Sequence, residues 1–273
     1  MPIRSILLHV DATPASVARL TLAHALADRH GARITALFGV RPYVSRATFA
    51  YSAGAALRAA AEEGVPHEHE RARLHELLAD HEPECAWCEV AGDSVRHGFV
   101  AEAIYADLLI LGAPPGGDDE GAAPVGFVEA VILESVTPAI VVPYPERQET
   151  MGERVVVAWN GSASAARALK AALPLLRKAA SVHVAIWGPQ PPAAPFSRID
   201  VGIWLRRHGI EAELHSSPST AHVANELAAL ASEVRADLIV MGCYGHSRIR
   251  EQVFGGVTRA LLATLPVPIL MTH

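Results

Sequence analysis

The sequence has few cysteines, no long apolar run and no excess of basic residues. Three cysteines cannot pair evenly, so the disulfide framework of a small secreted domain is not indicated. No apolar run approaches the ~18 residues of a membrane-spanning helix, and the apolar start at residues 1–10 is too short for a signal peptide. The net charge of −6 argues against a nucleic-acid partner. We therefore expect a soluble cytoplasmic protein with no membrane partner.

Several motifs of catalytic and cofactor sites are also missing. The sequence contains neither G-x-x-x-x-G-K-[ST] nor G-x-G-x-x-G, the two common phosphate-binding fingerprints. The metal motif H-E-x-x-H and the nucleophile motif G-x-S-x-G are likewise absent. We therefore assign no catalytic residue and no metal ligand from the sequence.

Apolar runs of strand length alternate with helical patterns, and 51 % of residues are hydrophobic, enough for a large core. In the first part we expect strands at 5–10, 32–40, 84–90, 108–111 and 139–142, and helices at 13–30, 62–81, 94–106 and 126–135. In the second part we expect strands at 154–159, 182–187, 211–215, 238–241 and 268–272, and helices at 162–179, 199–208 and 221–234. This alternation predicts an α/β fold with parallel sheets covered on both faces.

The second part of the chain repeats the first. Four pairs of residues lie 130 positions apart without a gap: Asp107 and Asp237, Gly112 and Gly242, Gly126 and Gly256, Pro138 and Pro268. Upstream, Asp11 aligns with Asn160 at a distance of 149 residues rather than 130. The first part therefore carries extra chain, which we place within residues 41–67. We expect two tandem, Rossmann-like domains at residues 1–145 and 151–273, joined by a polar linker at 144–149.

Residues 237–258 are the most informative stretch. An apolar strand leads into a loop that contains Gly242, Gly245, Gly255 and Gly256, and a helical pattern follows. Glycine lets backbone N–H groups approach a ligand closely, and a helix N-terminus attracts anions. Three basic residues of the loop add positive charge: His246, Arg248 and Arg250. These features predict a phosphate-binding site, although the same glycines could serve only a tight turn.

The spacing of these glycines resembles the nucleotide motif of the universal stress protein family. Gly242, two residues, Gly245, nine residues and Gly255 match that motif, whereas Gly256 stands where the family has Ser or Thr. The resemblance covers nearly the whole chain. It implies a five-stranded parallel sheet with helices on both sides in each domain, and an ATP-binding protein of the stress response. ADP or AMP in place of ATP, and an accompanying Mg²⁺, are left open.

Together the motif and the strand ends indicate a nucleotide site in the second domain. Open α/β sheets bind ligands at the carboxyl ends of their strands. The expected site residues are Ala158, Trp159, Asn160, Trp187, Met241, Gly242, Tyr244, Gly245, His246, Arg248, Gly255, Gly256, Val257 and Thr258. Asn160 stands where the family usually has an acidic residue. Trp187 either stacks on adenine or packs at the sheet edge.

The corresponding loop of the first domain differs in ways that oppose phosphate binding. Pro115 replaces Gly245 and has no N–H to donate, and Val125 replaces Gly255. Three acids stand where the second loop is basic: Asp118, Asp119 and Glu120. We therefore expect ATP only in the second domain. Asp11 either caps the helix that follows it or belongs to a remnant pocket.

Other functions and sites remain as alternatives. A slow ATP hydrolase or nucleotide-transfer enzyme is the first, and a thiol or metal sensor through Cys85 and Cys88 is the weaker second. Because these cysteines are three apart in an expected strand, they should lie on opposite faces. The histidines at 67–81 are better explained as an exposed helix face, and Ser162 as a helix N-cap. From the family we expect the last strands, 139–142 and 269–271, to pair as an intramolecular pseudo-dimer, which could dimerise again.

Overall fold

The computed structural model of the chain describes residues 2–39, 68–79, 85–90, 95–113, 126–143, 150–187, 200–217, 223–243, 261 and 267–273. The first half holds β1 (Ser5–Val10), α1 (Ala15–His30), β2 (Arg33–Gly39), α3 (Glu68–Ala79), β3 (Ala86–Val90), α4 (Val95–Ala103), β4 (Leu108–Gly112), α5 (Phe127–Glu134) and β5 (Ala139–Val142). The second half holds β6 (Arg154–Trp159), α6 (Ala163–Leu176), β7 (Ser181–Trp187), α7 (Val201–Arg207), β8 (Glu213–Ser217), α8 (Val223–Glu233), β9 (Leu238–Gly242) and β10 (Ile269–Thr272). Every predicted strand is confirmed, with ends within two residues of those expected.

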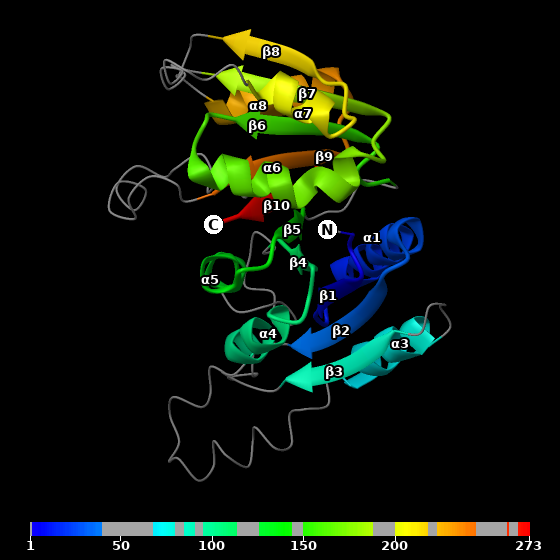
Figure 1. The fold of residues 1–273 in the computed structure, drawn as a ribbon. Helices are drawn as coiled ribbons and strands as arrows, with labels where there is room; N and C mark the ends of the chain where they lie inside the picture. The colour runs from blue at the N-terminus through cyan, green and yellow to red at the C-terminus, as the bar shows by residue number, and fades with distance from the viewer. Residues whose placement is uncertain are drawn as a thin grey trace.

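All ten of these strands belong to one sheet, in the order β3-β2-β1-β4-β5-β10-β9-β6-β7-β8 (Figure 1). Within each half every pairing is parallel, and the two halves meet in an antiparallel pair, β5 with β10. The strand order of the second half mirrors that of the first. The expected fold, two tandem α/β units with five parallel strands each, is therefore confirmed, as is the pairing of their last strands.

A local two-fold relation joins the halves. At the centre of the β5–β10 pair, Ile140 faces Leu270, and these residues are equivalent in the repeat. A second reciprocal contact joins the end of α1 to the segment after α6: the Arg29 side chain donates to the Lys178 carbonyl, and the Lys178 side chain donates to the Arg29 carbonyl. Arg29 and Lys178 are also 149 residues apart, the spacing of Asp11 and Asn160. Such reciprocity is typical of a two-fold interface, which here lies inside one chain.

Helices cover both faces of the sheet, which explains why its strands are apolar runs rather than alternating patterns. On one face α1, α3, α6 and α7 pack on a continuous apolar core, and on the other α4, α5 and α8 form a second core (Figure 1). In the inner strand β4 all five residues are buried. No helix among the described residues is both long enough and apolar enough to span a bilayer.

Equivalent hydrogen bonds confirm the repeat. Leu109 N–H donates to Pro138 and Ile239 N–H donates to Pro268, both at 2.9 Å. The carboxylate of Asp107 accepts from the N–H groups of Arg4 and Ser5. The carboxylate of Asp237 accepts in the same way from the segment before β6, namely from the Thr150 hydroxyl and the N–H groups of Gly152, Glu153 and Arg154. Each aspartate thus fixes the start of the central strand of its half.

Candidate functional site at the strand ends of the second half

The carboxyl ends of β6, β7 and β9 lie level with one another. Trp159 pairs with Ile186, and the pairing of Val157 with Val240 places Trp159 level with Gly242. Because the three strands are parallel, the segments that follow them leave the sheet at this same edge. The structure therefore brings together the strand ends that the sequence assigned to a nucleotide site.

The turn after β6 exposes polar groups at this edge. The exposed Asn160 side chain accepts a hydrogen bond from Ser162 N–H at 3.1 Å. The Ser162 hydroxyl accepts from Ala165 N–H at 3.1 Å, so Ser162 is the N-cap of α6, as predicted. A helix N-terminus and an accessible amide thus face the same edge, an arrangement that suits an anionic ligand.

Gly242 is required by packing at this point. A Cβ atom there would lie 2.3 Å from Ala165 N, 2.4 Å from the Ser164 carbonyl carbon and 2.7 Å from Ser164 Oγ. The end of β9 therefore packs directly on the backbone of the first turn of α6. The first glycine of the loop motif has a structural role, in addition to any contact with a ligand.

Six of the predicted site residues lie within the described structure. Trp159 is half-buried against the α6-side core, whereas Ala158 and Trp187 pack against the α8-side core. This packing accounts for Trp187 without a ligand. Met241 is buried in the core. The other eight lie outside the described residues: Tyr244, Gly245, His246, Arg248, Gly255, Gly256, Val257 and Thr258.

The equivalent edge of the first half is closed. Val10, Asp11 and Thr13 are buried, whereas Trp159 and Ser162, the counterparts of Val10 and Thr13, are half-buried and Asn160 is exposed. The Asp11 carboxylate accepts from Thr13 N–H at 3.1 Å, from Thr13 Oγ1 at 2.5 Å and from Ser16 Oγ at 2.8 Å. Asp11 therefore joins the turn before α1 to the Ser16 side chain in its first turn, but it does not cap the helix, since the N-cap is Pro14 and no side chain makes a capping hydrogen bond.

Arg19 completes this closure, and the sequence did not point to it. Its Nη2 atom lies 2.8 Å from Asp11 Oδ1, and a Cβ atom on Gly112 would lie 2.0 Å from Arg19 Nη1. The guanidinium thus fills the space between α1 and the end of β4. Burial alone would raise the pKa of Asp11, but Arg19, His9 and the hydrogen bonds from Thr13 and Ser16 lower it to about 2. A comparison of the halves could have found Arg19, because Ala168 stands at the equivalent position.

His9 is a third buried ionisable side chain in this region, beside Asp11 and Arg19. Its Nε2 atom lies 3.2 Å from the Gly39 carbonyl, and its ring centroid lies 4.6 Å from that of Phe127. Burial lowers the pKa of His9 to about 4, against an opposing effect of Asp11. The neutral ring is therefore the form that the folded protein holds.

We expect the stability of the protein to fall as the pH falls from about 6.5 to about 4, in part because of His9. In that window the unfolded chain binds a proton at His9 that the folded chain does not, and from pH 7 to pH 5 this costs about 2 kcal/mol. His9→Phe keeps the ring contacts but cannot titrate, so its unfolding free energy should fall less over this interval. Urea unfolding at both pH values measures the difference, and equal falls in both proteins would contradict the assignment.

Among the described residues, the cysteines and histidines near α3 and β3 do not gather into a group with metal-ligand geometry. Cys85 packs on the α6-side core and Val90 on the opposite one, so Cys88, two residues before Val90, lies on the other face from Cys85. Burial raises the pKa of the Cys85 thiol to about 11, which makes its reactive thiolate rare. Within the described part of the chain, the residues with metal-ligand geometry are instead His183, Glu213 and His215.

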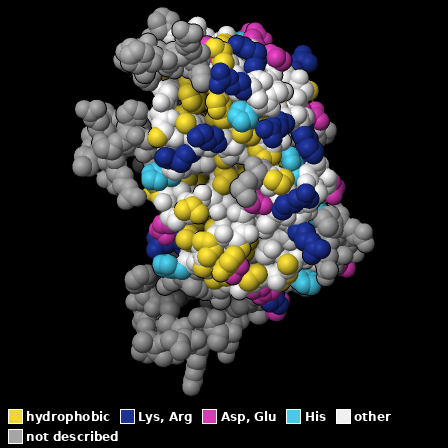
Figure 2. Space-filling model, viewed as in Figure 1, with side chains coloured by type: hydrophobic (Ala, Val, Ile, Leu, Met, Phe, Trp, Pro, Cys, Tyr) yellow, Lys and Arg dark blue, Asp and Glu magenta, His cyan; other side chains and the backbone are white. Residues whose placement is uncertain are grey.

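Positive charge gathers locally although the whole chain is acidic. Figure 2 shows Lys and Arg side chains spread over the near face, where α6 and α7 lie. The exposed basic residues on α6, directly after it and on α7 are Arg167, Lys170, Arg177, Lys178, Arg206 and Arg207. Arg167 and Lys170 lie on α6 itself, which begins at the candidate site, whereas Arg177, Lys178, Arg206 and Arg207 lie at the C-terminal ends of α6 and α7, toward the opposite edge of the sheet.

Comparison with known proteins supports the fold class and relates the second half to a known family. Residues 151–273 match the universal stress protein family. Over almost the whole chain, the fold is similar to that of a universal stress protein from Archaeoglobus fulgidus DSM 4304, with a TM-score of 0.70, 18% identity and coverage of 98% of this chain and 95% of that one. A presumed universal stress protein from Pseudomonas aeruginosa UCBPP-PA14 follows, with a TM-score of 0.62, 17% identity and coverage of 99% and 93%. No curated protein matches the chain.

These comparisons treat the two halves differently. The family match applies to the second half by sequence. The structural likeness spans both halves but, at these identities, concerns the fold alone. The expectation of two universal stress protein domains therefore has sequence support in the second half and fold support in the first.

Proposed function

We propose that the second half, residues 151–273, binds an adenine nucleotide, with ATP as the first candidate, and that the first half, residues 1–145, binds none. The bound nucleotide would act as a signal of cellular state in a stress response rather than as the substrate of a dedicated reaction. The family match of residues 151–273 supports the ligand class.

The contrast between the two strand edges carries this proposal. At the end of β6 the Asn160 side chain is exposed, and Trp159 and Ser162 are half-buried. At the end of β1 the counterpart Asp11 is buried, and its carboxylate is occupied by Thr13, Ser16 and Arg19. A ligand that approaches the first edge would have to displace a buried ion pair, whereas a ligand at the second meets accessible polar groups and a capped helix N-terminus.

The loop sequences point in the same direction. Gly245, His246 and Arg248 can offer an N–H group and positive charge to phosphate, whereas Pro115 and the acids at 118–120 cannot. We place the adenosine near Ala158, Trp159 and Asn160, and the phosphates on the loop after Gly242. Mg²⁺, if bound, would then be held mainly by the phosphates.

Calorimetric titration of the untagged chain with ATP tests the proposal. We expect one nucleotide per chain, no binding by Gly245→Pro, because proline removes an N–H and restricts the loop, and unchanged binding by the matched variant Pro115→Gly. Two nucleotides per chain, or none at millimolar ATP, would contradict the proposal. Turnover of ATP-Mg²⁺ faster than about one per minute would replace the signalling role with hydrolysis.

A further inference from the structure

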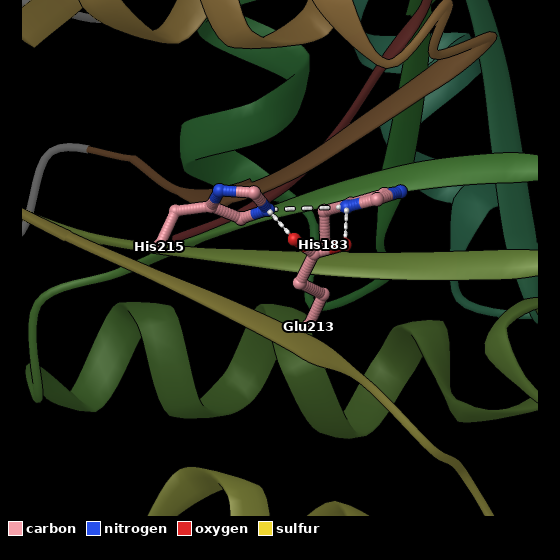
Figure 3. A group of neighbouring side chains, drawn as sticks. All are labelled: His183, Glu213 and His215. Atoms are coloured by element: carbon pink, nitrogen blue, oxygen red, sulfur yellow. Dashed lines mark hydrogen bonds and ion pairs between the residues drawn. The ribbon is translucent and has the colours of Figure 1, made fainter.

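Three side chains with metal-ligating atoms converge on the outer strands of the second half. His183 lies on β7, and Glu213 and His215 lie on β8, the edge strand of the sheet (Figure 3). His183 pairs with Glu213 in the register, and His215 is two residues further along β8. Since side chains alternate along a strand, all three are on one face, the face that also presents Trp187 and packs against α8.

The distances between the ligand atoms fit one small cation. His183 Nδ1 lies 3.1 Å from His215 Nε2 and 3.5 Å from Glu213 Oε2, and His215 Nε2 lies 3.9 Å from Glu213 Oε1. A tetrahedral zinc ion with bonds of about 2.0–2.1 Å places neighbouring ligand atoms about 3.3 Å apart. Shifts of a few tenths of an ångström would therefore bring all three atoms into coordination.

The exposure of the group also suits a cation. The side chains of His183, His215 and Glu213 are 13%, 27% and 67% exposed, which leaves an entry path on the carboxylate side. Two neutral imidazoles and one carboxylate carry one negative charge, which offsets half of the charge of a divalent ion.

The donor set indicates which ion it would be. Imidazole nitrogens suit borderline transition metals, whereas Ca²⁺ and Mg²⁺ prefer oxygen ligands. Two histidines with one carboxylate leave a fourth position for water, as in open zinc sites. We propose that His183, Glu213 and His215 form a binding site for a divalent transition-metal ion such as Zn²⁺, which joins the edge strand β8 to β7.

The proposed site is independent of the nucleotide proposal, so each can fail without the other. Untagged full-length protein, depleted of metal and free of nucleotide, is titrated with Co²⁺ and then with Zn²⁺. We expect one ion per chain, with the visible absorption of tetrahedral cobalt, which Zn²⁺ displaces. We also expect Zn²⁺ to raise the melting temperature, because it binds the folded chain.

Matched variants assign the ion to these residues. His183→Gln and His215→Gln should lose both the cobalt spectrum and the zinc-dependent rise in melting temperature, and Glu213→Gln should weaken both. Glu211→Gln and His69→Gln, which alter exposed residues outside the group, should bind like the wild type. If His183→Gln does not fold, the variants of the more exposed Glu213 and His215 still test the proposal. Absence of binding in the wild type, or unchanged binding in His215→Gln, would overturn the proposal.

Discussion

Arg19→Ala is expected to lower the free energy of unfolding by about 3 to 5 kcal/mol, because it leaves the buried Asp11 carboxylate without its cationic partner. Arg19 and Asp11 are both buried, and Arg19 Nη2 also donates to Ser16 Oγ at 2.7 Å. Removal of the side chain would in addition open a cavity against Gly112. Urea unfolding followed by circular dichroism measures the change.

Two controls separate the ion pair from general effects. Arg71→Ala breaks an exposed pair with Glu68 and Glu89 and should cost less than about 1 kcal/mol. The double variant Arg19→Met with Asp11→Ala should recover part of the loss, because no charge then stays buried without a partner. If Arg19→Ala is no more destabilising than Arg71→Ala, the closure of the first half does not depend on this pair.

Gly242→Ala is expected to destabilise the protein by about 3 kcal/mol or more, because the added methyl group overpacks a site that cannot yield. The nearest atoms are the backbone of Ser164 and Ala165 at 2.3 to 2.4 Å, so α6 would have to move away from β9. Denaturant unfolding measures the loss.

Gly209→Ala is the matched control for this prediction. Gly209 has a positive φ of 76° but open space around it, so alanine there should cost only the backbone strain of about 1 kcal/mol. Ser164→Gly should not rescue Gly242→Ala, since the backbone contacts would persist. An alanine at Gly242 that is tolerated as well as one at Gly209 would contradict the packing role. Because a substitution at Gly242 would disturb the packing of α6 on β9, nucleotide binding should be tested at Gly245 instead.

The sequence was sufficient for much of the fold because the relevant signals are local. Apolar runs such as those of β4 and β9 are strands buried on both faces. The repeat is visible because equivalent residues, such as Asp107 and Asp237, keep the same spacing along the chain. The strand β8 was placed two residues too early. As the edge strand of the sheet, β8 is less buried than the inner strands. Its sequence, ELHSS, therefore contains one apolar residue, and the apolar pattern that predicts a strand is weak.

The site was predictable only where it follows the strand ends. Trp159, Asn160 and Gly242 meet at one edge, as parallel strands require. The group of His183 with His215 was missed, because no sequence spacing tells which side chains of separate elements meet in space. The net charge of −6 likewise did not predict the basic surface of α6 and α7.

The reciprocal contacts between the halves have a consequence for how such a protein can change. In a homodimer every substitution occurs on both sides of the symmetry axis. Here the axis relates segments of different sequence, so a buried ion pair could arise at Asp11 and Arg19 while Asn160 and Ala168 stand opposite. Covalent linkage therefore lets one side carry a buried ion pair and the other an exposed strand end, while both continue to share a single sheet.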